Sequence, residues 1–147
     1  MSLQTECAML QNIPMFRNVD IAKLRLLAMS GNRIQYEAGE IIFKQAGEPD
    51  AVYVLLEGTV DIIRETEPRV RLAQLGGNAM FGETGVLCDM PRTATVEAST
   101  PAIVIEIERN AFNEVVRDVP QLALAIAREL ARRLEHMNEQ FAASSRS

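Results

Sequence analysis

The 147-residue chain is poor in the residue types that build disulfide frameworks, metal sites and many catalytic centres. It has two cysteines, Cys7 and Cys88, and a single histidine, His136. Two distant cysteines suggest neither a disulfide framework nor a zinc site, and one histidine cannot supply the several converging ligands of a barrel-type metalloenzyme. No pairing of a nucleophile with a base stands out either. We therefore expect no metal, no cofactor and no enzymatic activity, and a reducing cytoplasm as the location.

Positive charge and long apolar runs are also scarce. Lysines and arginines number 15 against 20 aspartates and glutamates, which gives a formal net charge of -5. Nucleic acids and anionic membranes are bound mainly by clustered positive charge, so this balance disfavours both as general partners. The sequence has no positively charged start followed by an apolar run and no stretch of about eighteen apolar residues, so it predicts neither a secretion signal nor a membrane span.

What the chain does contain suits a single globular domain over residues 1–147. Hydrophobic residues make up 48% and charged residues 24% of the sequence, which is ordinary for a soluble protein of this length. The domain is expected to have an N-terminal helical segment over 1–32, a β-rich region over 33–109, C-terminal helices over 110–142 and a disordered tail over 143–147.

Two short helices are predicted in the N-terminal segment. The first spans 3–10, and the second spans 21–30 because apolar residues recur there at helical spacing. Asp20 stands immediately before the second helix and is predicted to be its N-cap. Three further residues are predicted to pack in the core: Met15, Phe16 and Met29.

The periodicity changes after Arg33, where short apolar runs alternate with glycine-containing turns. The run at 51–56 and the alternating isoleucines at 103–107 are typical of strands. Repeated strands and turns at this spacing predict a double-sheet jelly-roll barrel, so the fold class is mainly β with flanking helices. The charged segment 65–69 is predicted to be an exposed hairpin tip.

The C-terminal helical region falls into two parts. A short helix is expected to have Asn110 as its cap and to break between Asp118 and Pro120. The longer helix that follows carries an apolar stripe at spacings of three and four residues, which can pack on the barrel or meet another partner. The stripe consists of Leu122, Ile126, Leu130, Leu134, Met137 and Phe141.

Residues 81–96, with the sequence FGETGVLCDMPRTATV, concentrate features that suit an anion. Gly82 lets the backbone approach closely, the amides after it can face a ligand, and Arg92 offers a planar guanidinium for phosphate. Glu83 has no use in a site for phosphate alone, but a carboxylate accepts hydrogen bonds from sugar hydroxyls. The segment predicts a ligand in which a phosphate is joined to a sugar. The competing interpretation is that Glu83 and Arg92 pair with each other and only brace a loop.

This segment closely resembles the phosphate-binding cassette of the cyclic nucleotide-binding domain family, in which Phe-Gly-Glu precedes Pro-Arg-Ser/Thr-Ala-Thr-Val. The resemblance continues through residues 39–43, 50–58 and 75–83, so it covers most of the chain and implies the family's jelly-roll barrel. Gly85 departs from the alanine often found in the family, at a cost in helix propensity. Asn78 stands where a glycine is common, and Asn tolerates the positive φ of the turn.

The resemblance implies a role for each residue of the cassette. The Gly82 amide and Arg92 hold the cyclic phosphate, the Ala94 amide is a further donor to it, and Thr93 adds a hydroxyl. Glu83 holds the ribose 2′-hydroxyl. The remaining residues expected at the nucleotide are Phe81, Thr84, Leu72 and Arg128. An arginine of the long helix can stack on a purine face, although a solvated face is the competing interpretation for Arg128 and its neighbours.

The resemblance also implies how the chain acts. Family members bind cyclic AMP or cyclic GMP, and the hydroxyl of Thr93 does not decide between them. The long C-terminal helix moves when nucleotide binds, closing over the base or forming the seam of a homodimer, and a downstream protein partner reads the signal. Transcriptional members add a winged helix-turn-helix after this helix, for which we expect no room here, so no direct DNA binding is predicted.

Two other functions fit the same residues. A docking or dimerisation module of the same fold would keep the barrel and the long helix but bind no nucleotide. A redox sensor would use Cys88 beside the cassette, although a lone thiol with apolar neighbours is usually inert.

Overall fold

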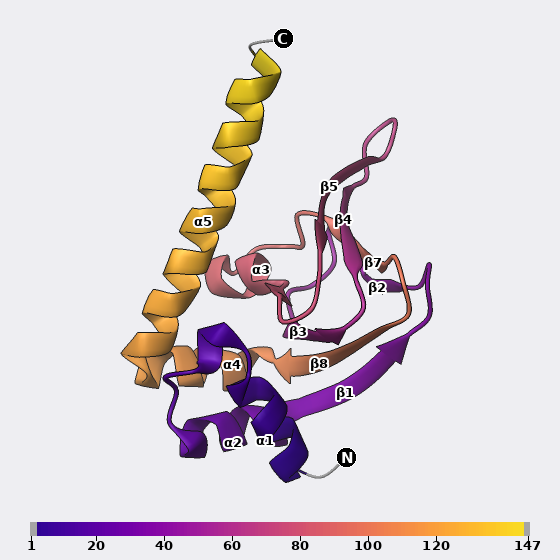
Figure 1. Cartoon of the computed structure of the whole chain (residues 1–147). Coiled ribbons are helices and arrows are strands. Elements are labelled where there is room, and N and C mark those ends of the chain that lie inside the picture. The colour runs from indigo at the N-terminus through magenta and orange to yellow at the C-terminus, as the bar shows by residue number, and fades with distance from the viewer. Residues whose placement is uncertain (1–2, 146–147) are drawn as a thin grey trace.

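Residues 3–145, which the computed structural model describes, form two antiparallel sheets flanked on one side by helices (Figure 1). The helices are α1 (Leu3–Gln11), the short 3-10 helix η1 (Pro14–Phe16), α2 (Ile21–Ser30), α3 (Glu83–Cys88), α4 (Arg109–Asp118) and α5 (Pro120–Ser145). The strands are β1 (Gly31–Tyr36), β2 (Ile41–Phe43), β3 (Ala51–Glu57), β4 (Val60–Arg64), β5 (Val70–Leu75), β6 (Met80–Phe81), β7 (Thr95–Ala98) and β8 (Ala102–Glu108).

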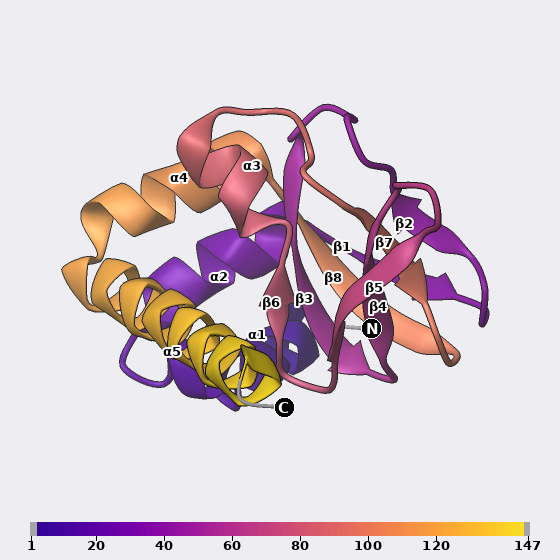
Figure 2. The same cartoon turned by 90° about the horizontal axis from the view of Figure 1, so that it is seen from above.

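The strand order explains why the sheets roll into a barrel. One sheet has the order β1-β8-β3-β6 and the other has the order β2-β7-β4-β5. Because β2 is followed by β3, and β6 by β7, the chain passes repeatedly from one sheet to the other, and Figure 2 shows the two sheets facing each other. Each strand pair is antiparallel. The predicted jelly-roll barrel with flanking helices is confirmed.

Strand β3 separates two hydrophobic cores. Successive side chains of a strand point to opposite faces, so Tyr53 and Leu55 enter the barrel interior while Val52 and Val54 pack under the helices. Both faces are buried, which is why residues 51–56 read as a continuous apolar run rather than an alternating one. This strand therefore fixes the helical layer and the barrel wall to each other.

The helical layer buries most of the residues predicted for it. Phe16 is fully buried and Met15 packs partly buried against the same core. The prediction is wrong for Met29, whose side chain is 66% exposed. Its neighbours Leu27 and Ala28 define the inward face of α2, and one further residue along a helix points away from that face.

The ends of α2 and α4 can be compared with the caps and the break that the sequence predicted. Asp20 caps α2 as predicted, since its side chain accepts a hydrogen bond of 3.3 Å from the amide of Ala22. Asn110 is not the cap of α4. Glu108 takes that place and accepts from the amide of Ala111 at 3.1 Å, so the helix starts two residues earlier than expected. The predicted break between Asp118 and Pro120 is confirmed.

Helix α5 is longer than predicted and only its first half packs against the domain. Residues 143–145, expected in a disordered tail, are helical, while 146 and 147 lie outside the described residues. Leu122 and Ile126 are buried, but Leu134 is 60% exposed and Met137 and Phe141 are exposed as well. Figure 1 shows the second half of α5 running past α3 and beyond the helical layer. The first half of the apolar stripe thus belongs to the core, and the second half lies on the surface.

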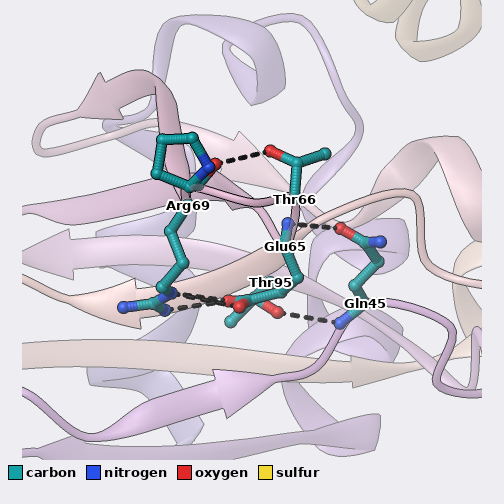
Figure 3. A network of polar contacts seen from close by, with 6 residues as sticks. Gln45, Glu65, Thr66, Arg69 and Thr95 are labelled. Carbon is teal, nitrogen blue, oxygen red and sulfur yellow. Dashed lines mark hydrogen bonds and ion pairs between the residues drawn. The ribbon is translucent and has the colours of Figure 1, made fainter.

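The hairpin between β4 and β5 has the exposed, charged tip that the sequence predicted, and polar contacts order it (Figure 3). Arg69 donates to both carboxylate oxygens of Glu65 at 3.0 and 3.1 Å, and this hydrogen bonding lowers the pKa of Glu65. The side chain of Gln45 accepts from the amide of Glu65 at 2.8 Å, and the amide of Gln45 donates to the Thr95 hydroxyl at 3.0 Å. The tip is therefore tied to the loop between β2 and β3.

Two kinds of feature are absent from the described part of the chain. Over residues 3–145, none of the helices combines the length and the apolar character needed to cross a membrane. Over the same residues, no three histidine, cysteine, aspartate or glutamate side chains gather where they would hold a metal ion.

The half-packed helix generates a matched pair of stability predictions. We expect Leu122→Ala to lower the free energy of unfolding by about 2–5 kcal/mol, because it leaves a cavity under α5. We expect Leu134→Ala, the same change on the exposed half of the helix, to alter it by no more than about 0.5 kcal/mol. Urea denaturation of both variants measures this, and similar losses in the two would show that the second half of α5 is buried.

Candidate functional site

The cassette begins where the first sheet gives way to a short helix. Strand β6 pairs with β3, so that Phe81 lies opposite Tyr53 in the barrel interior. The chain then turns at Gly82 into α3, and after Pro91 it returns past Arg92 to β7. The residues predicted to contact a phosphate and those predicted to contact a sugar are thus held by the same wall of the barrel.

Position 82 requires a glycine for two reasons, its backbone conformation and the close contacts around it. Its φ is 81°, a left-handed conformation that glycine adopts without penalty. A Cβ placed there would lie 3.0 Å from Nη1 of Arg92 and 3.2 Å from the ring of Phe43. Gly82 therefore lets Arg92 lie directly against the start of the cassette, as the sequence predicted for a close backbone approach.

Arg92 carries a positive charge into the barrel wall. Its side chain is 2% exposed, and it lies 3.8 Å from the carboxylate of Asp50. Nη1 donates to the carbonyl of Gly82 and Nη2 donates to the carbonyl of Ala51, both at 2.6 Å. Its backbone also bonds the loop before β3, through the carbonyl of Gly47 at 2.9 Å. One residue thus joins the cassette, β3 and the loop between β2 and β3.

Aromatic rings complete the surroundings of this guanidinium. Its Cζ lies 4.1 Å from the ring centroid of Phe43, which suits a cation above an aromatic face. Tyr53 stacks on Phe81 with centroids 5.3 Å apart, and its hydroxyl donates to Glu106 at 3.0 Å. Burial lowers the pKa of Arg92, but its ordinary pKa is so high that the group stays charged.

Arg92 also has a donor that nothing satisfies. Within residues 3–145, its Nε is the buried side-chain polar atom that lacks a hydrogen-bond partner. An unsatisfied buried donor on a charged group is costly and calls for an explanation, such as an acceptor supplied from outside the chain.

Glu83 does not pair with Arg92, so the interpretation in which the two lock together does not describe this structure. Its side chain is only 4% exposed, and Oε1 accepts from Nη1 of Arg133, in α5, at 3.0 Å. Burial raises the pKa of Glu83, and the nearby charges of Arg133 and Arg92 lower it without cancelling that effect. The Glu83 side chain is therefore paired with an arginine fifty residues away in the sequence.

The other predicted site residues differ in their exposure and in the elements that carry them. Within the cassette, Thr84 and Thr93 are exposed, while Ala94 is buried. Leu72 is exposed on β5, the edge strand of the second sheet. Arg128 is exposed and lines a groove of about 650 Å3 between α5, η1 and the turn before β6.

Sequence reasoning missed several residues that act on the cassette. Nothing local to Asp50 or Phe43 signals that they would flank Arg92, because the barrel brings them there. Arg133 stands in the sequence beside Arg128 and Arg132 on the long helix, and spacing alone does not say which of the three reaches Glu83. Cys88 lies at the end of α3 and is exposed, whereas Cys7 is buried.

Comparison with known proteins identifies this arrangement. Residues 33–118, which hold the barrel, α3 and α4, match the family described as the cyclic nucleotide-binding domain. The chain belongs to this family. The resemblance seen in the cassette is confirmed.

Individual relatives of this cyclic nucleotide-binding domain are moderately similar. It is 28% identical over 118 residues to the cAMP-dependent protein kinase regulatory subunit of Dictyostelium discoideum, covering 77% of this chain and 36% of that protein. It is 27% identical over 130 residues to the CRP-like cAMP-activated global transcriptional regulator of Mycobacterium tuberculosis, covering 86% of this chain and 58% of that one. The sensor domain of the transcriptional regulator DNR from Pseudomonas aeruginosa superposes with a TM-score of 0.79 at 25% identity, covering 93% of each chain.

These relatives are longer than this chain, which limits the conclusions that the similarity supports. The chain spans 36% and 58% of the two curated relatives, so it corresponds to one part of each. The similarity therefore concerns the domain and not the activity of a whole protein.

The buried carboxyl of Glu83 generates a pH prediction. A carboxyl whose pKa is higher in the folded state binds more protons when folded, so its contribution to the free energy of unfolding grows as pH falls through that range. Lowering the pH from about 7 toward about 4.3, the ordinary pKa of glutamate, is expected to shift the stability difference between wild type and Glu83→Gln in favour of wild type.

Denaturation curves of both proteins across this pH range test the expectation. Glu139→Gln, at an exposed position of α5, is the matched control for the same chemical change. A difference that stays constant with pH, or moves in favour of Glu83→Gln, would contradict the assignment of a raised pKa to Glu83.

Proposed function

We propose that this domain is a regulatory module that binds a 3′,5′-cyclic purine nucleotide, cyclic AMP or cyclic GMP, and breaks no bond. The observation that carries the proposal is Arg92, a buried cation whose side chain lies against the start of the cassette and has an unsatisfied Nε. A phosphate oxygen is the acceptor that such a group fits best, because charge-assisted hydrogen bonds between guanidinium and phosphate are strong.

Different residues of the site are proposed to contact different parts of the nucleotide. Arg92 and the amides of Gly82 and Ala94 take the phosphate, and Thr93 adds its hydroxyl. Glu83 takes the ribose 2′-hydroxyl, which suits a buried carboxylate that needs donors. Phe81, Thr84, Leu72 and Arg128 face the rest of the ligand.

The names of the relatives support this ligand class without separating its members. The Dictyostelium protein is named for cAMP, and the cGMP-dependent protein kinase of Toxoplasma gondii is also similar, at 28% identity over 117 residues. Both cyclic nucleotides are therefore proposed as ligands, and the comparison of the two is part of the test.

The signal is proposed to travel through α5. Ligand shifts a conformational equilibrium only if it binds one conformation better than the other. A helix with one packed half and one exposed half is suited to two positions, because moving the exposed half disturbs no core residue. The exposed residues Leu134, Met137 and Phe141 would then cover the base or form the seam of a homodimer. We place the protein in the cytoplasm, acting on a downstream protein and not on DNA or a membrane.

A second candidate is a docking or dimerisation module of the same fold that binds no nucleotide. It is favoured by the same arginine, because both Nη atoms of Arg92 already donate to backbone carbonyls and its side chain is almost fully covered. In this account the Arg92 charge only fastens the barrel wall together.

Thermal unfolding with cyclic AMP, cyclic GMP and 5′-AMP separates the two candidates. Under the proposal a cyclic nucleotide at 100 times its Kd stabilises the wild type by about 2.7 kcal/mol, and 5′-AMP at the same concentration does much less. If neither cyclic nucleotide raises the melting temperature, the docking module remains.

Substitution of Arg92 tests its role directly. We expect Arg92→Gln to weaken cyclic nucleotide binding by about 10- to 100-fold, because it removes charge-assisted bonds worth about 1.5–3 kcal/mol each. Arg25→Gln makes the same change at an exposed position of α2 and should leave binding unchanged. Calorimetry measures both, after circular dichroism has confirmed that each variant is folded. Equal affinity in the wild type and Arg92→Gln would remove Arg92 from the site.

A further inference from the structure

The loop between β2 and β3 is bonded to the backbone of Arg92 in both directions. The amide of Ala46 donates to the carbonyl of Arg92 at 2.8 Å, and the amide of Arg92 donates to the carbonyl of Gly47 at 2.9 Å. The place of this loop therefore sets where the backbone of Arg92 lies and where its side chain begins.

The same loop holds one residue in an unfavourable conformation. Ala46 has a φ of 71°, in the left-handed region that residues with a Cβ rarely adopt. A residue keeps such a conformation only where the surrounding contacts fix it, and positions of this kind gather at ligand-binding sites. The contacts that fix this loop are therefore candidates for a role at the phosphate site.

Gln45 supplies two of these contacts (Figure 3). Its amide donates to the hydroxyl of Thr95 at 3.0 Å, and its Oε1 accepts from the amide of Glu65 at 2.8 Å. Thr95 is buried at the start of β7, three residues after Arg92. The loop is thus fastened on one side to the strand that follows Arg92 and on the other side to the hairpin between β4 and β5.

The hairpin tip offers Gln45 a fixed donor. Arg69 bonds both carboxylate oxygens of Glu65, so the residue whose amide meets Gln45 is held by its own side chain as well. Hydrogen bonding from Arg69 lowers the pKa of Glu65, and the Thr95 hydroxyl contributes to the same lowering. The loop, the hairpin tip and β7 therefore share one polar network.

We propose that Gln45 and Thr95 are positioning residues that hold the loop against Arg92 and so fix its guanidinium where it can meet the phosphate. The inference rests on the proposed function, and neither residue is assigned a contact with the nucleotide. The Arg92 side chain is buried with both Nη atoms bonded to backbone carbonyls, so a displaced backbone displaces the guanidinium as well. Placing this group before the ligand arrives lowers the cost of binding.

A double-mutant cycle tests whether Gln45 acts through Arg92. Wild type, Gln45→Leu, Arg92→Gln and the double variant are titrated by calorimetry with cyclic AMP and with cyclic GMP. We expect Gln45→Leu to weaken binding by about three- to tenfold, the effect of losing one hydrogen bond. In the Arg92→Gln background the same change should weaken binding by less than about twofold, because residues that act through one another are not additive.

Gln35→Leu is the matched control for this cycle. It makes the same change at an exposed position of β1, which belongs to the sheet that lacks β4 and β7. It should leave the affinity unchanged, and circular dichroism should show every variant folded. An effect of Gln45→Leu that is equal in both Arg92 backgrounds would overturn the positioning role.

Thr95 allows a second test that depends on its hydroxyl alone. Thr95→Val removes the acceptor of the Gln45 amide and keeps the shape of the side chain, whereas Thr95→Ser keeps the hydroxyl. We expect Thr95→Val to bind about three- to tenfold more weakly than wild type, and Thr95→Ser to bind within about twofold of it. Equal affinities of these two variants would overturn the role of Thr95.

The titrations separate failure of this inference from failure of the proposed function. If wild type binds a cyclic nucleotide and Gln45→Leu binds it equally well, the positioning role is overturned while the proposed function stands. If neither cyclic nucleotide binds to wild type, the proposed function fails and the positioning role fails with it.

Discussion

The charge of Arg92 inside the barrel wall is the interaction on which the rest of the site depends. Water is replaced there by two backbone carbonyls and the ring of Phe43. Since the carbonyls belong to Gly82 and Ala51, a buried cation fixes the cassette to the central strand β3. Removing the Arg92 side chain would leave the carbonyls of Gly82 and Ala51 without its donors. Its presence also costs stability, because the buried Nε has no acceptor.

Packing around β3 explains why this arrangement is rigid on one side and adjustable on the other. The strand has a core on each face, so the barrel wall and the first half of α5 belong to one packed body. Beyond Leu130 the helix meets the barrel through polar contacts of Arg133. Apolar packing therefore positions the site, and Arg133 links it to the exposed part of the helix.

The sequence predicted the features that depend on neighbouring residues. The jelly-roll class, the Asp20 cap and the break before Pro120 follow from local patterns and are confirmed. The positive φ that the family resemblance implied for Asn78 is confirmed as well. Contacts between distant segments were not predictable in this way. The pairing of Glu83 with Arg133 spans fifty residues, and no spacing distinguishes Arg133 from Arg128. The roles assigned to the cassette residues stay predictions until a ligand is seen.

The most direct measurement is a crystal structure of the domain grown with cyclic AMP. The account predicts phosphate oxygens within about 3.2 Å of the Arg92 guanidinium, including its Nε, and the ribose 2′-hydroxyl against Glu83. A nucleotide bound elsewhere on the domain, with Arg92 still bonded only to the carbonyls of Gly82 and Ala51, would contradict it.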